Sequence, residues 1–177
     1  FWGDPGGKRY HESYFDTYPG VWRHGDLLKE TERGSYIIAG RSDSTLNRHG
    51  IRIGTSEVYR TVEELAEVVD SLVVHLEPAG RPDQLILFVV LAQSVVLDDG
   101  LKLKLARALR EQRSPRHVPE QVLAVSAIPY TLTGKKMEVP VKRILLGADP
   151  DEVANRDAMG NPSSIEEYTK FAKQMSF

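Results

Sequence analysis

The longest apolar run in the sequence most strongly limits what this chain can fold into. It covers residues 85–92 and reads Leu-Ile-Leu-Phe-Val-Val-Leu-Ala. A membrane-spanning helix needs about 20 apolar residues, whereas a buried strand needs only about four to eight. Residues 71–76 are similarly rich in β-branched and large apolar side chains, and Pro78, Gly80 and Pro82 separate the two segments. The pattern therefore predicts two buried strands joined by a turn.

Helical patterns flank this strand pair. Apolar residues recur at helical spacing over residues 55–69, where Thr55 or Ser56 can cap the first turn and Glu57 lies where the helix dipole favours an acid. Residues 101–113 begin with alternating leucine and lysine, as a strand would, but they lack β-branched residues and place leucines on one helical stripe. We expect helices over both segments.

Shorter elements complete the predicted order. Residues 35–41 form a β-type run, and a second turn follows at residues 47–50, which together indicate a small hairpin. Residues 121–125 are typical of a third strand, and Pro140 stands at a tolerated first-turn position of a last short helix. The predicted fold is α+β, with a small three-stranded sheet, packed helices and a β-hairpin.

The two ends of the chain are less regular. Residues 1–26 are rich in glycine and aromatic residues without a sustained period, and the chain begins at Phe1 rather than at a methionine. We expect loops and edges of a larger body there, with an N-terminal portion missing from this chain. After Gly147 the composition becomes polar, and a capped helix is expected near residues 163–168. We expect this tail to lie on the surface.

Charge and cysteine content exclude several functions. With 23 basic and 25 acidic side chains the net charge is −2, which gives no general attraction to nucleic acids or anionic membranes. There is no cysteine, so a disulfide framework, a thiolate metal site and a cysteine nucleophile are excluded. A reducing compartment such as the cytoplasm fits this composition. His24 and His49 have no second ligand at helical or hairpin spacing, so no protein metal site is predicted.

Three polar clusters carry the chemistry that the sequence offers. In the first, Asp26 follows Gly25 and an aromatic residue, Trp22. Its carboxylate oxygens could accept both hydroxyl protons of a ribose diol, although an aspartate that caps an ordinary turn gives the same pattern. In the second, Arg41 and Arg52 flank a glycine-containing turn, and their guanidinium groups could bind a phosphate ester or be simply solvated.

The third cluster is the loop over residues 128–136, Ile-Pro-Tyr-Thr-Leu-Thr-Gly-Lys-Lys. A glycine-containing loop that carries a lysine can move an ammonium group onto another surface, where it stabilises negative charge on a transferring group. The loop is not a phosphate-binding Walker sequence, because Pro129 takes the place of its first glycine and Lys136 that of its final Ser or Thr. A solvated basic turn is the alternative, and we take Lys136 to be an ordinary solvated lysine.

In this order, the three clusters resemble the last three signature motifs of the adenylate-forming enzymes. Those motifs are an aromatic residue before Gly-Asp, then Gly-Arg-x-Asp with a later Gly and Glu, then Pro-x-Thr-x-(Ser/Thr)-Gly-Lys. The Leu-Asn pair at residues 46–47, Gly-x-Arg at residues 50–52 and Gly-Thr-x-Glu at residues 54–57 resemble the acetyl-CoA and acetoacetyl-CoA synthetase branch. Residues 114–119 and 128–139 are similar to the acetoacetyl-CoA synthetases of that branch, and the resemblance covers residues 1 to about 147. His24 and Glu138 depart from the broader family, which has a threonine and a basic residue at these places.

The resemblance implies three regions and a role for each matching residue. Residues 1–42 would end a large N-terminal adenylation domain, residues 43–147 would form a C-terminal swivelling domain, and residues 148–177 would be a polar tail with a short helix. The implied roles are ATP ribose binding for Asp26 and Arg41, phosphate binding for Arg52, the hinge for Asp43, CoA binding for Gly50 and Arg110, and catalysis of adenylation for Lys135.

The implied reaction converts acetoacetate, ATP and CoA to acetoacetyl-CoA, AMP and pyrophosphate through an acyl-adenylate, with Mg2+ arriving on ATP. The partners would be these small molecules and the protein's own N-terminal domain, with no nucleic acid and no membrane, and the isolated chain would be inactive. A CoA ligase for another short acid, such as acetate, and a non-catalytic nucleotide- or CoA-binding module remain open. The acid pocket would lie outside this chain, so the sequence does not choose between these acids.

Overall fold

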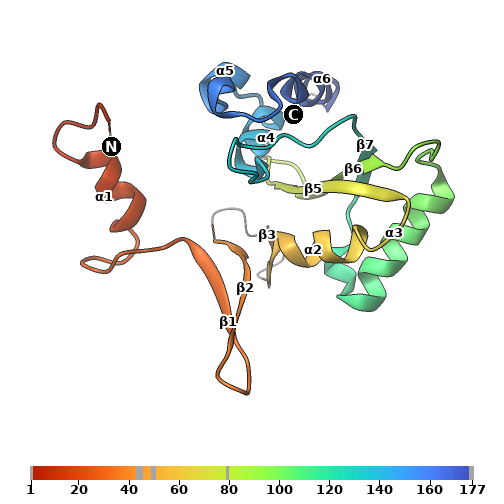
Figure 1. Cartoon of the computed structure of the whole chain (residues 1–177), viewed down its shortest axis with the longest axis horizontal. Coiled ribbons are helices and arrows are strands. Elements are labelled where there is room, and N and C mark those ends of the chain that lie inside the picture. Colours follow the sequence, from red (N-terminus) through yellow and green to blue (C-terminus); the bar gives the residue numbers. More distant parts are fainter. Residues whose placement is uncertain (1, 43–45, 49–50, 79, 176–177) are drawn as a thin grey trace.

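The computed structural model describes residues 2–42, 46–48, 51–78 and 80–175. Within them, seven strands and six α-helices follow one another (Figure 1), which confirms the predicted α+β class. In chain order the elements are α1 (Lys8–Tyr14), β1 (Asp26–Glu30), β2 (Tyr36–Arg41), β3 (Leu46–Arg48), β4 (Ile51–Ile53), α2 (Thr55–Val62), β5 (Val68–Leu76), β6 (Gln84–Leu91), α3 (Asp99–Gln112), β7 (Gln121–Ala124), α4 (Glu138–Leu145), α5 (Pro150–Val153) and α6 (Ile165–Met175). Short 3-10 turns cover Pro115–His117, Arg156–Ala158 and Pro162–Ser164.

The centre of the fold is the three-stranded sheet β5-β6-β7. β5 and β6 are antiparallel, as expected for strands joined by a short turn. β6 and β7 are parallel, because α3 carries the chain back between them. Successive residues of β5 and β6 face opposite sides of the sheet, and both sides are buried. This burial explains why the two strands appear in the sequence as unbroken apolar runs.

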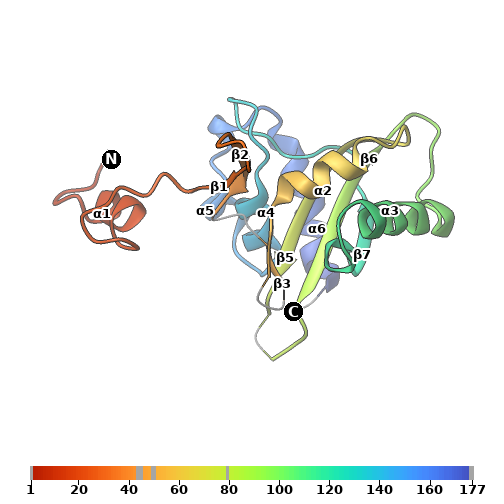
Figure 2. The same ribbon diagram turned by 90° about the horizontal axis from the view of Figure 1, so that it is seen from below.

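Helices cover both faces of this sheet. In Figure 1, α4, α5 and α6 lie above the sheet, and α2 and α3 lie below it. The core above the sheet contains Val74, Phe88 and Ile144, and the core below contains Leu87 and Leu105 among others. Figure 2 shows the same layers from below, with α2 nearest the viewer and the C-terminal helices behind the strands.

Two hairpins precede the sheet. β1 pairs with β2, with Asp26 opposite Arg41, and Gly34 closes the turn between them in a left-handed conformation, φ 72°. β3 and β4 form a second, shorter hairpin. The sequence indicated one hairpin and missed β1, because Asp-Leu-Leu-Lys-Glu contains no β-branched residue. The predicted β-type run therefore pairs with a strand that lies before it in the chain.

The predicted helix over residues 55–69 is wrong at its C-terminal end. α2 ends at Val62, and two tight turns lead from there into β5. Val68 and Val69 continue the helical spacing of the apolar residues, but they are β-branched, and Val68 lies opposite Leu91 in the sheet. Residues 68 and 69 fit both a helix by spacing and a strand by composition, and pairing with β6 decides for the strand.

The later elements match their predictions within a few residues. α3 begins after Asp98, whose carboxylate accepts a hydrogen bond from the Leu101 N–H at 2.8 Å, and three leucines of the predicted stripe are buried. Pro140 lies in the first turn of α4, where no backbone N–H is needed. No helix in the described part of the chain is both long and apolar enough to span a membrane.

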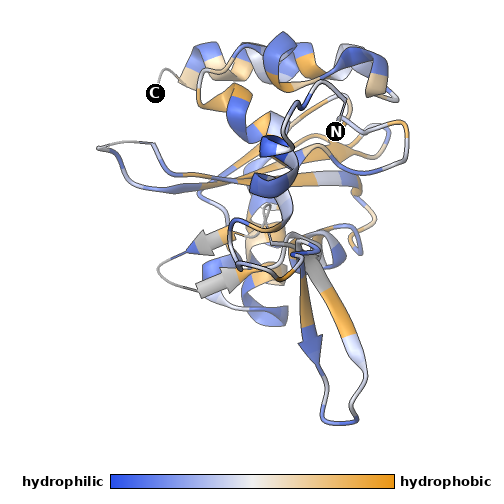
Figure 3. Ribbon diagram, turned by 90° about the vertical axis from the view of Figure 1, so that its left-hand side faces the viewer, coloured by the Kyte–Doolittle hydropathy of each residue, from blue (hydrophilic) through white to orange (hydrophobic). Residues whose placement is uncertain are grey.

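The C-terminal tail does not lie on the surface as the sequence suggested. Four of its residues are buried in the core above the sheet: Ala154, Met159, Ile165 and Tyr168. The Tyr168 ring packs edge-on against Phe88 of β6, with ring centroids 4.9 Å apart. Figure 3 shows hydrophilic and hydrophobic bands mixed along the C-terminal helices. A few well-spaced apolar residues therefore fix a segment whose composition is mainly polar.

Candidate functional site

Lys135 lies in a tight loop between β7 and α4. Tyr130 and Lys136 pair across an antiparallel bridge that closes the base of the loop. Thr131 donates its N–H to the Lys135 carbonyl at 2.9 Å, and the Lys135 N–H donates to the Thr131 hydroxyl at 3.1 Å. Gly134 adopts a left-handed conformation, φ 76°, that a larger residue would adopt only with strain. The Lys135 side chain is exposed, so its ammonium group is accessible to an approaching surface.

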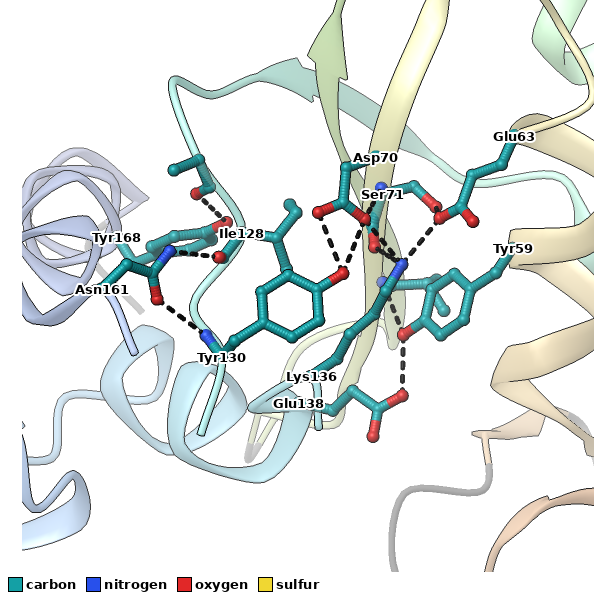
Figure 4. Close-up of polar contacts among 12 residues, drawn as sticks. Tyr59, Glu63, Asp70, Ser71, Ile128, Tyr130, Lys136, Glu138, Asn161 and Tyr168 are labelled. Carbon is teal, nitrogen blue, oxygen red and sulfur yellow. Dashed lines mark hydrogen bonds and ion pairs between the residues drawn. The ribbon is translucent and has the colours of Figure 1, made fainter. Parts of the chain in front are cut away.

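Lys136 is not the solvated lysine that the sequence suggested. Its side chain is 16% exposed, and its ammonium group forms ion pairs with Glu63 at 2.6 Å and Asp70 at 2.8 Å (Figure 4). The same ammonium donates to the Ser71 carbonyl at 2.6 Å and lies 4.1 Å from the centroid of the Tyr59 ring. These contacts fix the C-terminal arm of the loop to β5. These contacts could not be predicted from the sequence, because the hydrogen-bond partners of Lys136 lie 65 and 73 residues away.

Two tyrosines extend this cluster. Tyr59 donates its hydroxyl to Glu138 at 2.8 Å, and burial followed by the Glu138 charge raises the pKa of Tyr59 well above its usual value. The Tyr130 hydroxyl lies 3.0 Å from both carboxylate oxygens of Asp70. Burial, assisted by that hydrogen bond and charge, raises the pKa of Tyr130 as well. Glu138, which departs from the broader family, therefore serves as the acceptor for a partly buried phenol.

The structure brings two predicted nucleotide-site residues together on the β1–β2 hairpin. Asp26 begins β1 and lies opposite Arg41 at the end of β2. The Asp26 carboxylate is 2.7 Å from Nδ1 of His24. His24, which like Glu138 departs from the broader family, therefore adjoins the predicted ribose site. The side chain of Arg41 lies outside what the structure describes, so the proximity of Arg41 to Asp26 is known from the strand register alone.

The other predicted site residues lie on separate elements. Arg110 is exposed in the last turn of α3, below the sheet, whereas Lys135 precedes α4 above it (Figure 1). Arg52 belongs to β4, but its side chain lies outside the described part of the chain, as do Asp43 and Gly50 altogether. Among the described residues, no group of three or more His, Asp or Glu side chains is arranged to hold a metal ion.

Arg48 is a structural residue that the sequence did not single out. It is 7% exposed, and its guanidinium group donates to the carbonyls of Arg116 and Val118 at 2.8 Å each. It also forms an ion pair with Glu120, which accepts the Leu85 N–H at 2.7 Å. The planar fork of the guanidinium group suits this set of acceptors. Arg48 thereby fixes β3 to the segment that leads into β7.

The chain matches known proteins over its whole length. No protein-family model matches it. The acetoacetyl-CoA synthetase of Danio rerio is 41% identical over 178 residues, which cover 100% of this chain and 26% of that protein. The acetoacetyl-coenzyme A synthetase of Rhizobium meliloti (strain 1021) is 40% identical over 166 residues, which cover 94% of this chain and 25% of that protein. This chain thus spans about a quarter of the length of these relatives, and the first match includes the tail that the sequence resemblance left out.

A solved structure shares the fold. The acetoacetyl-CoA synthetase from Streptomyces lividans is 49% identical and has a TM-score of 0.90, and the match covers 99% of this chain and 26% of that protein. The predicted resemblance is therefore confirmed and extends to the tail. In sequence and in fold, this chain corresponds to the C-terminal part of the acetoacetyl-CoA synthetases, a branch of the adenylate-forming enzymes.

Proposed function

We propose that the protein to which this chain belongs joins acetoacetate to coenzyme A in two steps. In the first, a carboxylate oxygen of acetoacetate attacks the α-phosphorus of ATP, and pyrophosphate leaves. In the second, the thiolate of CoA attacks the acyl carbon of the adenylate, and AMP leaves. Similarity along the whole chain to acetoacetyl-CoA synthetases supports this reaction. The choice of acid rests on that similarity, because the acid pocket would lie outside this chain.

The placement of Lys135 is the observation that carries the proposal. Its side chain is exposed on a loop whose base is closed by the pairing of Tyr130 with Lys136. The backbone of a short, braced loop is already ordered, so mainly the lysine side chain loses conformational freedom when the loop meets a second surface. There its ammonium group would bind the acetoacetate carboxylate and the α-phosphate, where negative charge must be stabilised in the adenylation transition state.

The β1–β2 hairpin offers the groups for the nucleotide. Asp26 and Arg41 would hold the ATP ribose, and their opposition across the strand pair supports a shared role. The Asp26 carboxylate can accept hydrogen bonds from both ribose hydroxyls, and His24, 2.7 Å from it, would restrict its orientation. Arg52 would contact the phosphates, whose charge Mg2+ bound to ATP would partly neutralise.

The second step would use other groups after the swivelling domain turns. We assign CoA binding to Gly50 and Arg110, and the hinge to Asp43, which follows the β1–β2 hairpin closely in the chain. This division makes residues 1–42 the end of the larger domain and residues 43–147 the swivelling domain. A cytoplasmic location remains a prediction from composition.

The β1–β2 hairpin would belong to the larger domain, and its exposed apolar side chains support a contact with the rest of that domain. Leu28, Tyr36 and Ile38 are 61%, 64% and 63% exposed. Figure 3 shows the hairpin projecting from the rest of the chain, with hydrophobic bands on both strands. An apolar patch of this kind usually marks a covered surface. Because the relatives are about four times longer than this chain, the remaining polypeptide is the natural cover.

Lys135→Ala in the full-length protein tests the proposal. The change should lower acetoacetate-dependent exchange of pyrophosphate into ATP about a hundredfold, or about 3 kcal/mol, as expected for one charge-stabilising group. Capture of supplied acetoacetyl-adenylate by CoA should continue, because thioester formation would use the rotated domain with this loop withdrawn.

The matched control is Lys170→Ala, which removes an exposed lysine from α6. It should leave both half-reactions within about twofold of the parent rate. Exchange at the parent rate in Lys135→Ala would refute the assigned role. Faster exchange with acetate than with acetoacetate would assign a different acid to the same chemistry.

A further inference from the structure

The C-terminal tail binds the lysine loop through its backbone. Residues 158–160 run antiparallel to residues 130–132, next to the point where the loop begins. The contacts are Leu132 N–H to the Ala158 carbonyl at 2.9 Å, Gly160 N–H to the Tyr130 carbonyl at 2.9 Å, and an antiparallel bridge between Thr131 and Met159. The tail therefore supplies a short strand-like partner to the N-terminal arm of the loop.

Asn161 continues this contact with its side chain. Its Oδ1 accepts the Tyr130 N–H at 2.9 Å, and its Nδ2 donates to the Ile128 carbonyl at 2.7 Å (Figure 4). An amide side chain provides a donor and an acceptor at once, which an aspartate carboxylate or an apolar side chain does not. Asn161 is itself fixed, because its carbonyl accepts hydrogen bonds from the Ser164 N–H at 3.1 Å and hydroxyl at 2.7 Å.

The tail is well attached on its other side. Ile165 and Tyr168 are buried against the sheet, and the Tyr168 hydroxyl donates to the Ala127 carbonyl at 3.2 Å. The segment that carries Asn161 is therefore tied to the core and to the start of the loop-bearing segment. It forms a firm support rather than a loose appendage.

The opposite arm of the loop has a separate support. The ion pairs of Lys136 with Glu63 and Asp70 hold that arm to β5 and to the end of α2. The Lys135 loop thus leaves the domain from two fixed points, one on the tail and one on the sheet. A misplacement of about 1 Å can reduce the rate of a catalysed step about a hundredfold. Loss of one support should therefore act on the position of the ammonium group.

We propose that Asn161 is a positioning residue for the adenylation step. It touches none of the reacting atoms and acts through Lys135, by fixing the backbone from which the loop departs. The inference rests on the proposed function, and it assigns the tail a specific part in that function. The tail would matter for adenylation and not for thioester formation, in which the loop is withdrawn.

The test uses Asn161→Ala and Asn161→Asp in the full-length protein. Asn161→Ala should lower acetoacetate-dependent pyrophosphate exchange about tenfold, while capture of supplied acetoacetyl-adenylate by CoA stays within about twofold. Asn161→Asp keeps the acceptor for the Tyr130 N–H but turns a carboxylate oxygen toward the Ile128 carbonyl oxygen, which repels it, so this variant should lose at least as much exchange as Asn161→Ala. It also provides a second measurement if the alanine variant does not fold.

Glu167→Ala is the matched control. Glu167 also joins the tail to the chain before the loop, by accepting the Ser126 N–H at 2.9 Å and hydroxyl at 2.7 Å, but these bonds do not reach the loop. The control should not change the ratio of the two half-reaction rates. An equal fall of both half-reactions in the Asn161 variants, or the same selective loss in Glu167→Ala, would overturn the positioning role.

Hydrogen exchange separates this inference from the proposed function. In Asn161→Ala the amides of Tyr130 and Leu132 should exchange at least about tenfold faster than in the parent, because their fixed partner segment is loosened. Unchanged protection of both amides would refute the positioning role whatever acid the enzyme uses. A parent protein without acetoacetate-dependent pyrophosphate exchange would instead refute the proposed function.

Discussion

Lys136→Met should destabilise the domain, although it removes only one charged group from a loop. Methionine keeps most of the apolar stem over the Tyr59 ring but lacks the ammonium group that pairs with Glu63 and Asp70. The Ser71 carbonyl also loses its lysine donor. The two carboxylates would then lie in the same partly buried site without the cation between them. Their repulsion and incomplete solvation oppose the folded state.

The size of the effect follows from the burial of the partners. A hydrogen bond to a charged group contributes about 1.5–3 kcal/mol, and Lys136 makes several. The Glu63 and Asp70 side chains are 33% and 23% exposed, however, so water screens part of this interaction. We therefore expect a loss of about 2 kcal/mol in the free energy of unfolding, which corresponds to a fall of about 4–8 °C in Tm for a chain of this size.

Urea denaturation followed by far-UV circular dichroism measures this loss. The control is Lys142→Met on α4, which breaks an ion pair with Glu77, the residue after β5, where the two side chains are 37% and 54% exposed. The control should cost no more than about 0.5 kcal/mol. The denaturant dependence of the free energy should be the same in both variants. If Lys136→Met costs no more than the control, the cluster does not brace the loop.

Three further predictions concern other parts of the chain. Arg48→Ala should lower the free energy of unfolding by about 3 kcal/mol in urea denaturation. Arg48→Lys should recover less than half of this loss, because an ammonium group lacks the planar fork of the guanidinium group. Full recovery by lysine would contradict the assigned role of that fork. Burial raises the pKa of Tyr59, Tyr130 and Tyr168, so their neutral phenols favour the folded state. This contribution to the free energy of unfolding is complete below the ordinary tyrosine pKa of about 10 and is lost as the pH rises above that value. Tyrosinate absorbance should therefore rise in two phases, the second coinciding with unfolding, and a single phase near pH 10 in the folded protein would refute this. Asp43→Pro in the full-length protein should slow one half-reaction more than the other, whereas equal loss of both would indicate misfolding.

The sequence predicted those parts of the fold that local periodicity encodes. The two buried strands were evident because β5 and β6 are apolar on both faces, and α3 because its leucines share one stripe. β1 has no β-branched residues, and the helical spacing of apolar residues in α2 continues into β5. Both the presence of β1 and the end of α2 therefore depend on pairing with a partner strand, which the sequence does not show. The burial of the tail was hidden because only a few of its residues enter the core.

The candidate site divides in the same way. The order of its polar clusters and the exposed Lys135 loop with Gly134 were evident from the sequence, since the turn is formed by neighbouring residues. Only the tertiary structure decided that the adjacent Lys136 is paired rather than solvated, and that Asn161 binds the other arm of the loop. The physical reason is distance along the chain. An ion pair or a carboxamide contact between residues tens of positions apart leaves no periodic trace, because it depends on how the sheet and the tail bring those residues together.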